Sequence, residues 1–137
     1  MNLIIETIIT GPFQENSFIG WSSNSNEAFL IDPGDDVHLI IDFIENNGLV
    51  PKAIINTHAH LDHIGAVQPL KEKYNIPFYL HKNESFILET YEASCKLFGL
   101  EPNVKPEVDI WFDSECELQI NEFKFNTINT PGHTPGG

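Results

Sequence analysis

The sequence predicts an α/β fold with a mixed β-sheet, on two observations. In the middle of the chain, short apolar strand segments alternate with segments of helical periodicity, a pattern that favours parallel strands joined by helices. At both ends, strand segments follow one another with only turns between them, which is typical of antiparallel hairpins. The length of 137 residues and the hydrophobic content of 41% suit one domain with its own core. We therefore expect a single domain over residues 1–137.

The N-terminal third predicts three strands and then a helix. The expected strands cover residues 1–9, 17–21 and 27–31, with a polar hairpin loop at 22–26. The turn residues Asp32-Pro33-Gly34 end the third strand. Apolar residues at helical spacing then predict a helix that stops at Asn47-Gly48, with Asp35 or Asp36 as its N-cap.

Residues 53–56 form an expected apolar strand that leads directly into a cluster of histidines. The further expected elements are a helix over 64–74, a strand over 77–80, a longer helix over 84–98, strands over 110–112, 117–120 and 123–129, and a Pro/Gly-rich loop over 130–137. Pro69 inside the first of these helices predicts a kink or a late start. The apolar side of the second helix is expected to consist of Phe86, Ile87, Thr90, Tyr91, Cys95 and Phe98.

The composition excludes several classes of partner. The formal net charge is −13, and the seven basic residues are all lysines. A nucleic acid or an anionic membrane surface requires a basic face, so neither is an expected partner. No apolar run approaches the roughly 20 residues that span a membrane, and residues 1–10 lack the basic start of a secretory signal. We therefore expect a cytoplasmic protein, in which Cys95 and Cys116 stay reduced.

The segment Thr57–His63 concentrates metal-ligating side chains. It contains His58, His60, Asp62 and His63, and imidazole and carboxylate are the groups that bind Zn²⁺ and similar divalent cations. Structural histidines are usually single, so this density predicts a metal site. His38 and His81 stand alone in polar surroundings and are expected at the surface.

The spacing of these residues predicts two neighbouring metal positions. His58 and His60 fall on the same side of an extended segment, so one ion can bind both. Asp62 and His63 sit where a helix is expected to begin, and their side chains should diverge from the first pair. His133 lies in a loop of prolines and glycines, and three imidazoles plus a water would form a catalytic zinc arrangement. Asp32 reads by default as a turn residue.

Four motifs together resemble the metallo-β-lactamase superfamily. Residues 57–63, Thr-His-Ala-His-Leu-Asp-His, look like the His-x-His-x-Asp-His signature of that family. The segments Thr130–Gly136 and Ile31–Gly34 are similar to its other motifs. Gly11–Asn16 resembles the N-terminal hairpin of the glyoxalase II-like, or hydroxyacylglutathione hydrolase-like, branch.

The resemblance implies the fold, the ligands and the reaction. The fold would be the N-terminal portion of an αβ/βα sandwich with a dinuclear site at one sheet edge. His58, His60 and His133 would bind the first metal, Asp62 and His63 the second, and Asp32 would orient a ligating imidazole. Zinc is the expected metal, with two divalent ions in the complete enzyme, and iron or manganese also suit such ligands.

The expected reaction of the complete enzyme is hydrolysis of a small acyl thioester. Water on the metal has its pKa lowered towards about 7, and it attacks the acyl carbonyl as hydroxide. Asp62 is the expected catalytic residue, because it can orient this hydroxide as well as bind metal.

Family members continue beyond the motif around His133 and supply two more ligands from there. We therefore expect the 137-residue chain to be a truncated hydrolase that is inactive alone. One alternative is a mononuclear iron persulfide dioxygenase, which uses a similar scaffold. Another is a non-catalytic metal-binding fragment that self-associates through unpaired sheet edges.

Overall fold

The computed structural model describes residues 3–100, 105–113, 117–120 and 123–126. Six strands form one sheet in the order of the sequence, and two form a separate hairpin. The strands are β1 (Leu3–Thr10), β2 (Glu15–Ser22), β3 (Glu27–Ile31), β4 (Val50–Ile55), β5 (Phe78–His81) and β6 (Ile110–Phe112) in the sheet, and β7 (Glu117–Ile120) and β8 (Phe123–Asn126) in the hairpin. Strands β1 to β3 pair antiparallel, whereas β3 to β6 pair parallel. The predicted α/β fold with a mixed sheet is confirmed.

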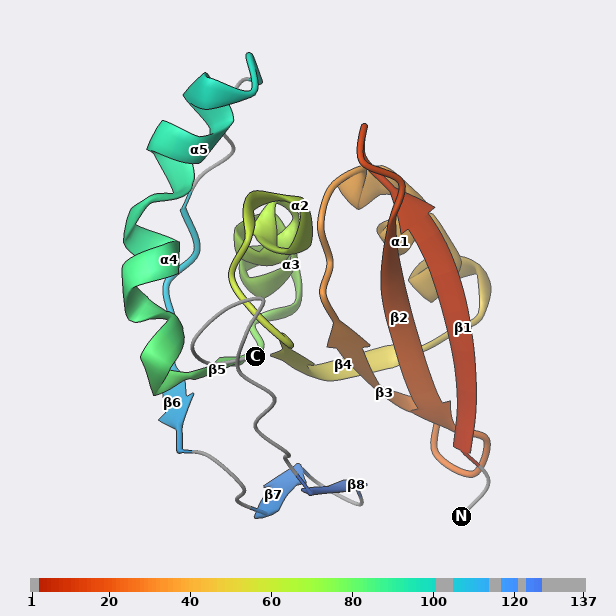
Figure 1. The fold of residues 1–137 in the computed structure, drawn as a ribbon. Coiled ribbons are helices and arrows are strands. Elements are labelled where there is room, and N and C mark those ends of the chain that lie inside the picture. The colour runs from red at the N-terminus through yellow and green to blue at the C-terminus, as the bar shows by residue number, and fades with distance from the viewer. Residues whose placement is uncertain (1–2, 101–104, 114–116, 121–122, 127–137) are drawn as a thin grey trace.

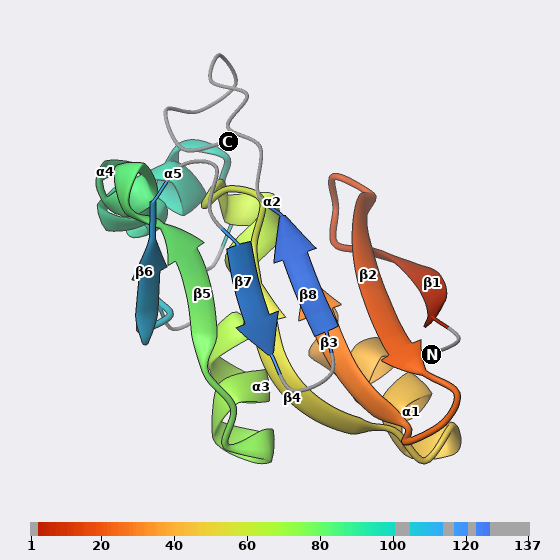
Figure 2. The same ribbon diagram turned by 90° about the horizontal axis from the view of Figure 1, so that it is seen from below.

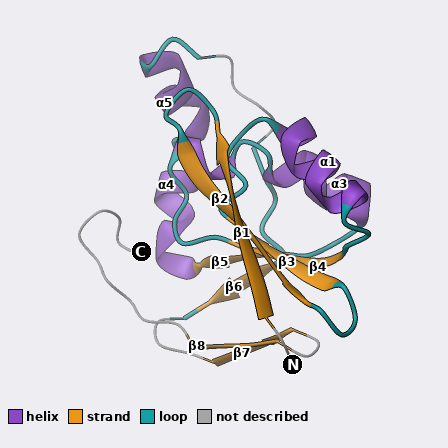
Figure 3. Ribbon diagram, turned by 90° about the vertical axis from the view of Figure 1, so that its right-hand side faces the viewer, coloured by secondary structure: helices purple, strands orange, loops and turns teal. Residues whose placement is uncertain are grey.

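The sheet lies between a layer of helices and the β7–β8 hairpin (Figures 1 and 3). The helices are α1 (Val37–Asn46), α2 (Leu61–Ile64), α3 (Val67–Tyr74), α4 (Ser85–Glu89) and α5 (Tyr91–Leu97), with a 3₁₀ turn, η1 (Lys82–Glu84), before α4. Seen from below, β7 and β8 cross the opposite face of the sheet, over β3 and β4 (Figure 2). None of the helices in the described ranges is both long and apolar enough to cross a membrane.

The main core lies between the sheet and α1 and α3. Ile40 and Ile44 of α1 and Leu70 of α3 are at most 1% exposed and pack in one cluster with the sheet residues Ile54 and Phe78. The 3–4 residue spacing on the helices and the continuous apolar run of β4 are the patterns that place these residues inside. Burial of apolar area of this kind is the main force that holds the two layers together.

Aromatic rings join the hairpin to the other face of the sheet. The ring of Phe29 on β3 packs edge-on against Phe123 and Phe125 of β8, with centroid distances of 4.9 and 4.8 Å. Gly20 of β2 lies beside the Phe29 ring, where a side chain would overlap it. The hairpin is therefore held by packing on β3 and not by pairing with the main sheet.

Both predicted long helices are divided. Of the helix expected over 64–74, only Ile64 belongs to α2, and the helical part that follows is α3, which begins at Val67. Pro69 sits in the first turn of α3, so the predicted late start is confirmed. The prediction of one helix over 84–98 was wrong, because α4 and α5 meet at Thr90. The Thr90 hydroxyl donates to the carbonyl of Ile87 at 2.7 Å, a local bond that competes with helix continuation.

The apolar side predicted for that helix was also partly wrong. Tyr91 and Cys95 are buried as expected, but Phe86 and Phe98 are 73% and 57% exposed, and Leu88 is buried instead. The break at Thr90 changes which residues face inward.

Asp36 occupies the N-cap position of α1 without a side-chain cap bond, since its Oδ2 accepts the Gly11 amide at 2.9 Å. The strand end at 127–129, the loop 130–137 and Cys116 lie outside the described residues.

Candidate metal centre

The metal-ligating side chains gather at the carboxyl ends of parallel strands. Asp32 directly follows β3, His58 comes three residues after the end of β4, and His81 ends β5. Polar groups on the loops at this end of a parallel sheet converge on one site, which is where open α/β sheets bind ligands. The apolar strand Val50–Ile55 is buried at its end and therefore fixes the start of the histidine segment.

Asn56 holds the histidine segment in its folded shape. Its side-chain amide donates to the carbonyl of His58 at 3.3 Å and to that of His63 at 2.6 Å. The side-chain oxygen Oδ1 of Asn56 accepts a hydrogen bond from the backbone amide of Asp32 at 3.2 Å. His60 remains extended, with φ −61° and ψ 152°, and is the N-cap of the single turn α2. One buried side chain thus ties both ends of the cluster to the end of β3.

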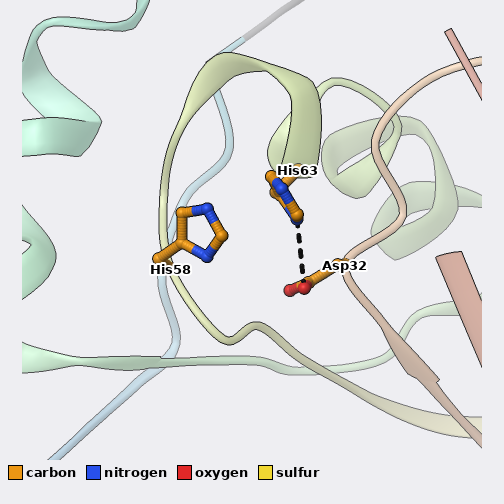
Figure 4. A group of neighbouring side chains, drawn as sticks. All are labelled: Asp32, His58 and His63. Carbon is orange, nitrogen blue, oxygen red and sulfur yellow. Dashed lines mark hydrogen bonds and ion pairs between the residues drawn. The ribbon is translucent and has the colours of Figure 1, made fainter. Parts of the chain in front are cut away.

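The three imidazoles lie close together. The ring centroids of His58 and His60 are 5.0 Å apart, and those of His58 and His63 are 4.0 Å apart. The expectation that His63 diverges from the first pair was wrong, because the α2 turn brings its ring back towards His58. Asp32, His58 and His63 each offer a ligand atom, and these three atoms lie within 4.8 Å of one another (Figure 4).

Asp32 orients His63 directly. Nδ1 of His63 donates to Oδ2 of Asp32 at 3.1 Å. Asp32 is 3% exposed and adopts a left-handed backbone with φ 52°, which aims its carboxylate at the site. Its other oxygen accepts the Thr57 amide at 2.7 Å. Because both oxygens are engaged within the protein, Asp32 suits the role of an orienting carboxylate better than that of a ligand.

Asp32 also fixes the tautomer of His58, through Thr57. The Thr57 hydroxyl donates its one proton to Oδ2 of Asp32 at 2.6 Å, and the same hydroxyl lies 2.9 Å from Nδ1 of His58. The hydroxyl must then accept from His58, so Nδ1 carries the proton of the neutral ring. Nε2 is left with the lone pair that a metal requires.

A second buried carboxylate, Glu15, also faces His63. Oε1 of Glu15 lies 3.2 Å from Nδ1 of His63, and burial raises the pKa of Glu15 in spite of this contact and its bonds to Ser17 and Thr10. Burial lowers the pKa of His63, but the hydrogen bonds to Asp32 and Glu15, with the charges of Asp32 and Asp62, raise it to about 10. The carboxylates around His63 therefore favour the protonated form of its ring.

The donor set fits a divalent cation. Oδ2 of Asp62 lies 3.5 Å from Nε2 of His63. Ligand bonds of about 2.0–2.2 Å in a tetrahedral zinc site put neighbouring donors at roughly this separation. Asp62 and His63 can thus share one ion, with Nδ1 of His63 held by Asp32. His58 and His60, with rings 5.0 Å apart, offer a second pair of nitrogens beside it.

The other sequence-predicted residues have different outcomes. His38 is exposed on α1, as expected. The surface prediction for His81 was wrong, because it is 3% exposed, its ring packs edge-on against Phe112, and its Nδ1 accepts the Asn83 amide at 3.0 Å. His133 lies outside the described residues, so its predicted part in the first metal site is not described by the structure.

Sequence reasoning missed Glu84, which contacts the backbone of the histidine segment. Its side chain is fully buried, and Oε1 accepts the backbone amide of Ala59 at 2.9 Å. Ala59 separates His58 from His60, so this bond fixes the backbone between two predicted ligands. A polar stretch after a strand gives no signal of burial. The one available hint to a role for Glu84 was that it follows β5, because β5 lies beside β4 in the sheet and β4 leads into the histidines.

Comparisons with known proteins identify the family of the chain. The family model of the metallo-beta-lactamase superfamily matches residues 10–137. A probable metallo-hydrolase of Bacillus subtilis, YqgX, is 41% identical over 128 residues, which cover 92% of this chain and 59% of the relative. The hydroxyacylglutathione hydrolase GloC of Haemophilus influenzae is 36% identical, over 96% of this chain and 63% of its own length. The chain thus spans about three fifths of these relatives.

Two solved structures superpose on nearly the whole chain. The BLEG-1 B3 metallo-beta-lactamase superposes with a TM-score of 0.88 at 36% identity, over 97% of this chain and 64% of that structure. TTHA1623 in a di-iron-bound form gives a TM-score of 0.83 at 34% identity, over 96% of this chain and 63% of that structure.

Proposed function

Because the chain belongs to the metallo-β-lactamase superfamily, we propose that it carries the metal centre of a hydrolase that cleaves a small acyl thioester, as hydroxyacylglutathione hydrolases do. The observation that supports it most is the convergence of His58, His60, Asp62 and His63 at the end of β4, with His63 held by Asp32. A relative named as a hydroxyacylglutathione hydrolase, at 36% identity over nearly the whole chain, supports the thioester class.

The proposed metal ligands are His58, His60 and His133 for one ion and Asp62 and His63 for the other. A bound divalent cation would lower the pKa of its water and polarise the substrate carbonyl. Zinc is the proposed metal, and the di-iron-bound relative makes iron the first alternative to measure. Asp32 and Thr57 hold the rings of His63 and His58 by hydrogen bonds to Nδ1, which would leave the Nε2 atoms to bind the ions.

Asp62 is the proposed catalytic residue. Its side chain is 31% exposed, so besides holding the metal the carboxylate would be accessible to a water molecule and could accept a proton from it. Water adds to the carbonyl carbon, the C–S bond breaks, and the products are a carboxylic acid and a thiol. A thiolate leaves without help from a strong acid, so the site needs no further proton donor.

The test is metal-dependent turnover. The chain spans about three fifths of its relatives, so it is assayed alone and in place of the matching segment of the Bacillus subtilis relative. We expect the hybrid protein, loaded with zinc or iron, to hydrolyse S-lactoylglutathione or simpler acyl thioesters. Chelation or the substitution Asp62→Asn should abolish turnover, whereas His38→Ala should not. A folded, metal-loaded hybrid that cleaves no thioester would overturn the proposal.

A further inference from the structure

An apolar pocket opens beside the candidate metal centre. It has a volume of about 340 Å³ and is lined by Phe13, His60, Leu61, Asp62, Ser94 and Phe98. This volume lies within the usual range of small-ligand sites, about 300–1,000 Å³. Two of the lining residues, His60 and Asp62, are proposed metal ligands. A molecule that fills the pocket therefore reaches the reacting centre.

Two distant segments form the apolar walls. Phe13 comes from the turn between β1 and β2, and Phe98 follows the end of α5. Their rings meet edge-on, with centroids 5.4 Å apart and an interplanar angle of 85°. Both rings stay partly open to solvent, at 45% and 57% exposure. Exposed aromatic side chains paired across a hollow mark a binding surface more than a core.

The turn that carries Phe13 is held in place. The amide of Gln14 donates to the carbonyl of Gly11 at 3.1 Å, and Gly11 adopts φ 73°, which favours glycine. The Gly11 amide donates to Oδ2 of Asp36 at 2.9 Å. Phe13 is thus presented by an anchored turn, so its wall of the pocket exists before a ligand binds.

The charge around the pocket disfavours an anion. Among the described residues that line it there is no lysine or arginine, and Asp62 contributes a carboxylate. A smaller hollow that shares Phe13, Leu61 and Asp62 adds a second carboxylate, Asp35. Beyond the end that faces the proposed metal ligands, a carboxylate or phosphate of a substrate would find no lysine or arginine among the described lining residues to pair with.

From this geometry we infer that the pocket binds the apolar acyl chain of the substrate, with the thioester carbonyl at its His60–Asp62 end. The inference rests on the proposed thioester hydrolysis and narrows its substrate class. Among small acyl thioesters, binding would strengthen as the uncharged hydrocarbon part of the acyl group lengthens, until the pocket is filled. Phe13, Leu61 and Phe98 would be its specificity determinants.

The test measures binding without turnover, on the metal-loaded 137-residue chain. The probes are ketone analogues of acyl-N-acetylcysteamine thioesters, in which a methylene replaces the sulfur, with acyl chains of graded length. Affinity should rise by up to about fourfold for each methylene group that becomes buried. A parallel series keeps the acetyl group and lengthens the thiol side, where we expect no such rise.

Two neighbouring residues supply a matched pair of variants. Phe98→Ser should abolish the dependence on chain length, whereas Leu97→Ser should leave it unchanged, because Leu97 is 82% exposed and is not part of the lining. Ser94→Leu, which fills the pocket, should weaken only the long-chain analogues. Affinity that does not depend on the length of the acyl chain, or that rises with the length of the thiol side, would overturn the inference.

The same variants separate this inference from the proposed function. Thioester cleavage that shows no acyl-length preference and is unaffected by Phe98→Ser would contradict the pocket assignment alone. Length-dependent binding of the ketones, together with a metal-loaded hybrid that cleaves no thioester, would contradict the proposed reaction and leave the apolar site in place.

Discussion

Oδ2 of Asp32 accepts the Nδ1–H of His63 at 3.1 Å, across 31 residues of sequence. The same oxygen accepts the hydroxyl proton of Thr57, which in turn accepts from His58. One buried carboxylate therefore sets the orientation of two imidazoles that belong to different proposed metal positions. This relationship makes the end of β3 part of the centre, although none of its residues needs to bind metal.

Asp32→Asn should weaken metal binding without unfolding the chain. Asparagine tolerates the left-handed backbone of position 32, but its amide cannot accept from Thr57 and His63 on both sides. We expect a loss of about 10–100-fold in zinc affinity, as is typical when a residue that orients a ligand is replaced. Competition with a chromophoric chelator measures it. Equal affinity of the folded variant and the wild type would show that Asp32 does not orient the ligands.

The metal-free protein should contain a protonated His63 at neutral pH. Burial lowers its pKa, but hydrogen bonds to Asp32 and Glu15 and nearby negative charge raise it to about 10. A folded pKa above the unfolded value of about 6.5 gives stability that is complete below pH 6.5 and is lost as the pH rises through 10. Side-chain NMR of the imidazole should show this late titration in the absence of metal.

Metal binding should also depend on the proton that His63 carries. At pH 7–8 the bound ion must displace it from His63, so binding should release about one proton at this residue and should tighten as the pH rises. Calorimetry in buffers of different ionisation enthalpy counts the released protons. A His63 ring that titrates near 6.5 in the metal-free chain would contradict the geometry given for Asp32 and Glu15.

Glu84 should act as a positioning residue for the segment between His58 and His60. Glu84→Ala removes the acceptor of the Ala59 amide, and we expect faster exchange of that amide and zinc affinity lower by about tenfold or more. Glu84→Gln retains an acceptor oxygen and should restore most of both. Glu92→Gln, at an exposed position of α5, is the matched control. If the Ala59 amide exchanges freely in the folded wild type, the proposed contact is absent in solution.

Gly34→Ala should disrupt the centre from the opposite side. A methyl group at position 34 would overlap the backbone carbonyl of Asp62 and meet the carboxylate of Glu15. Such overpacking costs about 1–3 kcal/mol, and here it also displaces a proposed ligand. We expect lower stability together with reduced metal binding. At Gly48, φ is +61° and an added Cβ would meet no other part of the protein within 4 Å, so Gly48→Ala should lower stability and leave metal affinity intact.

Much of the fold was predictable because its signals are local. The periodicity of β4 and α1 and the turn at Asp32-Pro33-Gly34 identified strands, helices and their order. The split of the 84–98 helix was not predictable, because Thr90 continues a helical pattern in sequence and interrupts it only through its bond to the Ile87 carbonyl. Helical periodicity does not register such competition from a side chain.

The candidate site also has one part that the sequence predicts and another that it does not. The cluster from His58 to His63 is contiguous, so its chemistry could be recognised directly. Glu15 and Glu84 come from segments more than 20 residues away, and each is only one acid among 20 in the sequence. Their importance comes from burial beside the histidines, which depends on the pairing of β2 with β3 and of β5 with β4 in the sheet.

The central claim is that the segment from His58 to His63 binds a divalent metal, and zinc titration of the purified chain tests it most directly. Wild type and His38→Ala should bind zinc equally, because His38 is exposed on α1. The double variant His58→Ala/His63→Ala should lose at least about 100-fold in affinity while it keeps its circular dichroism spectrum. A folded double variant that binds zinc as tightly as the wild type would contradict the account.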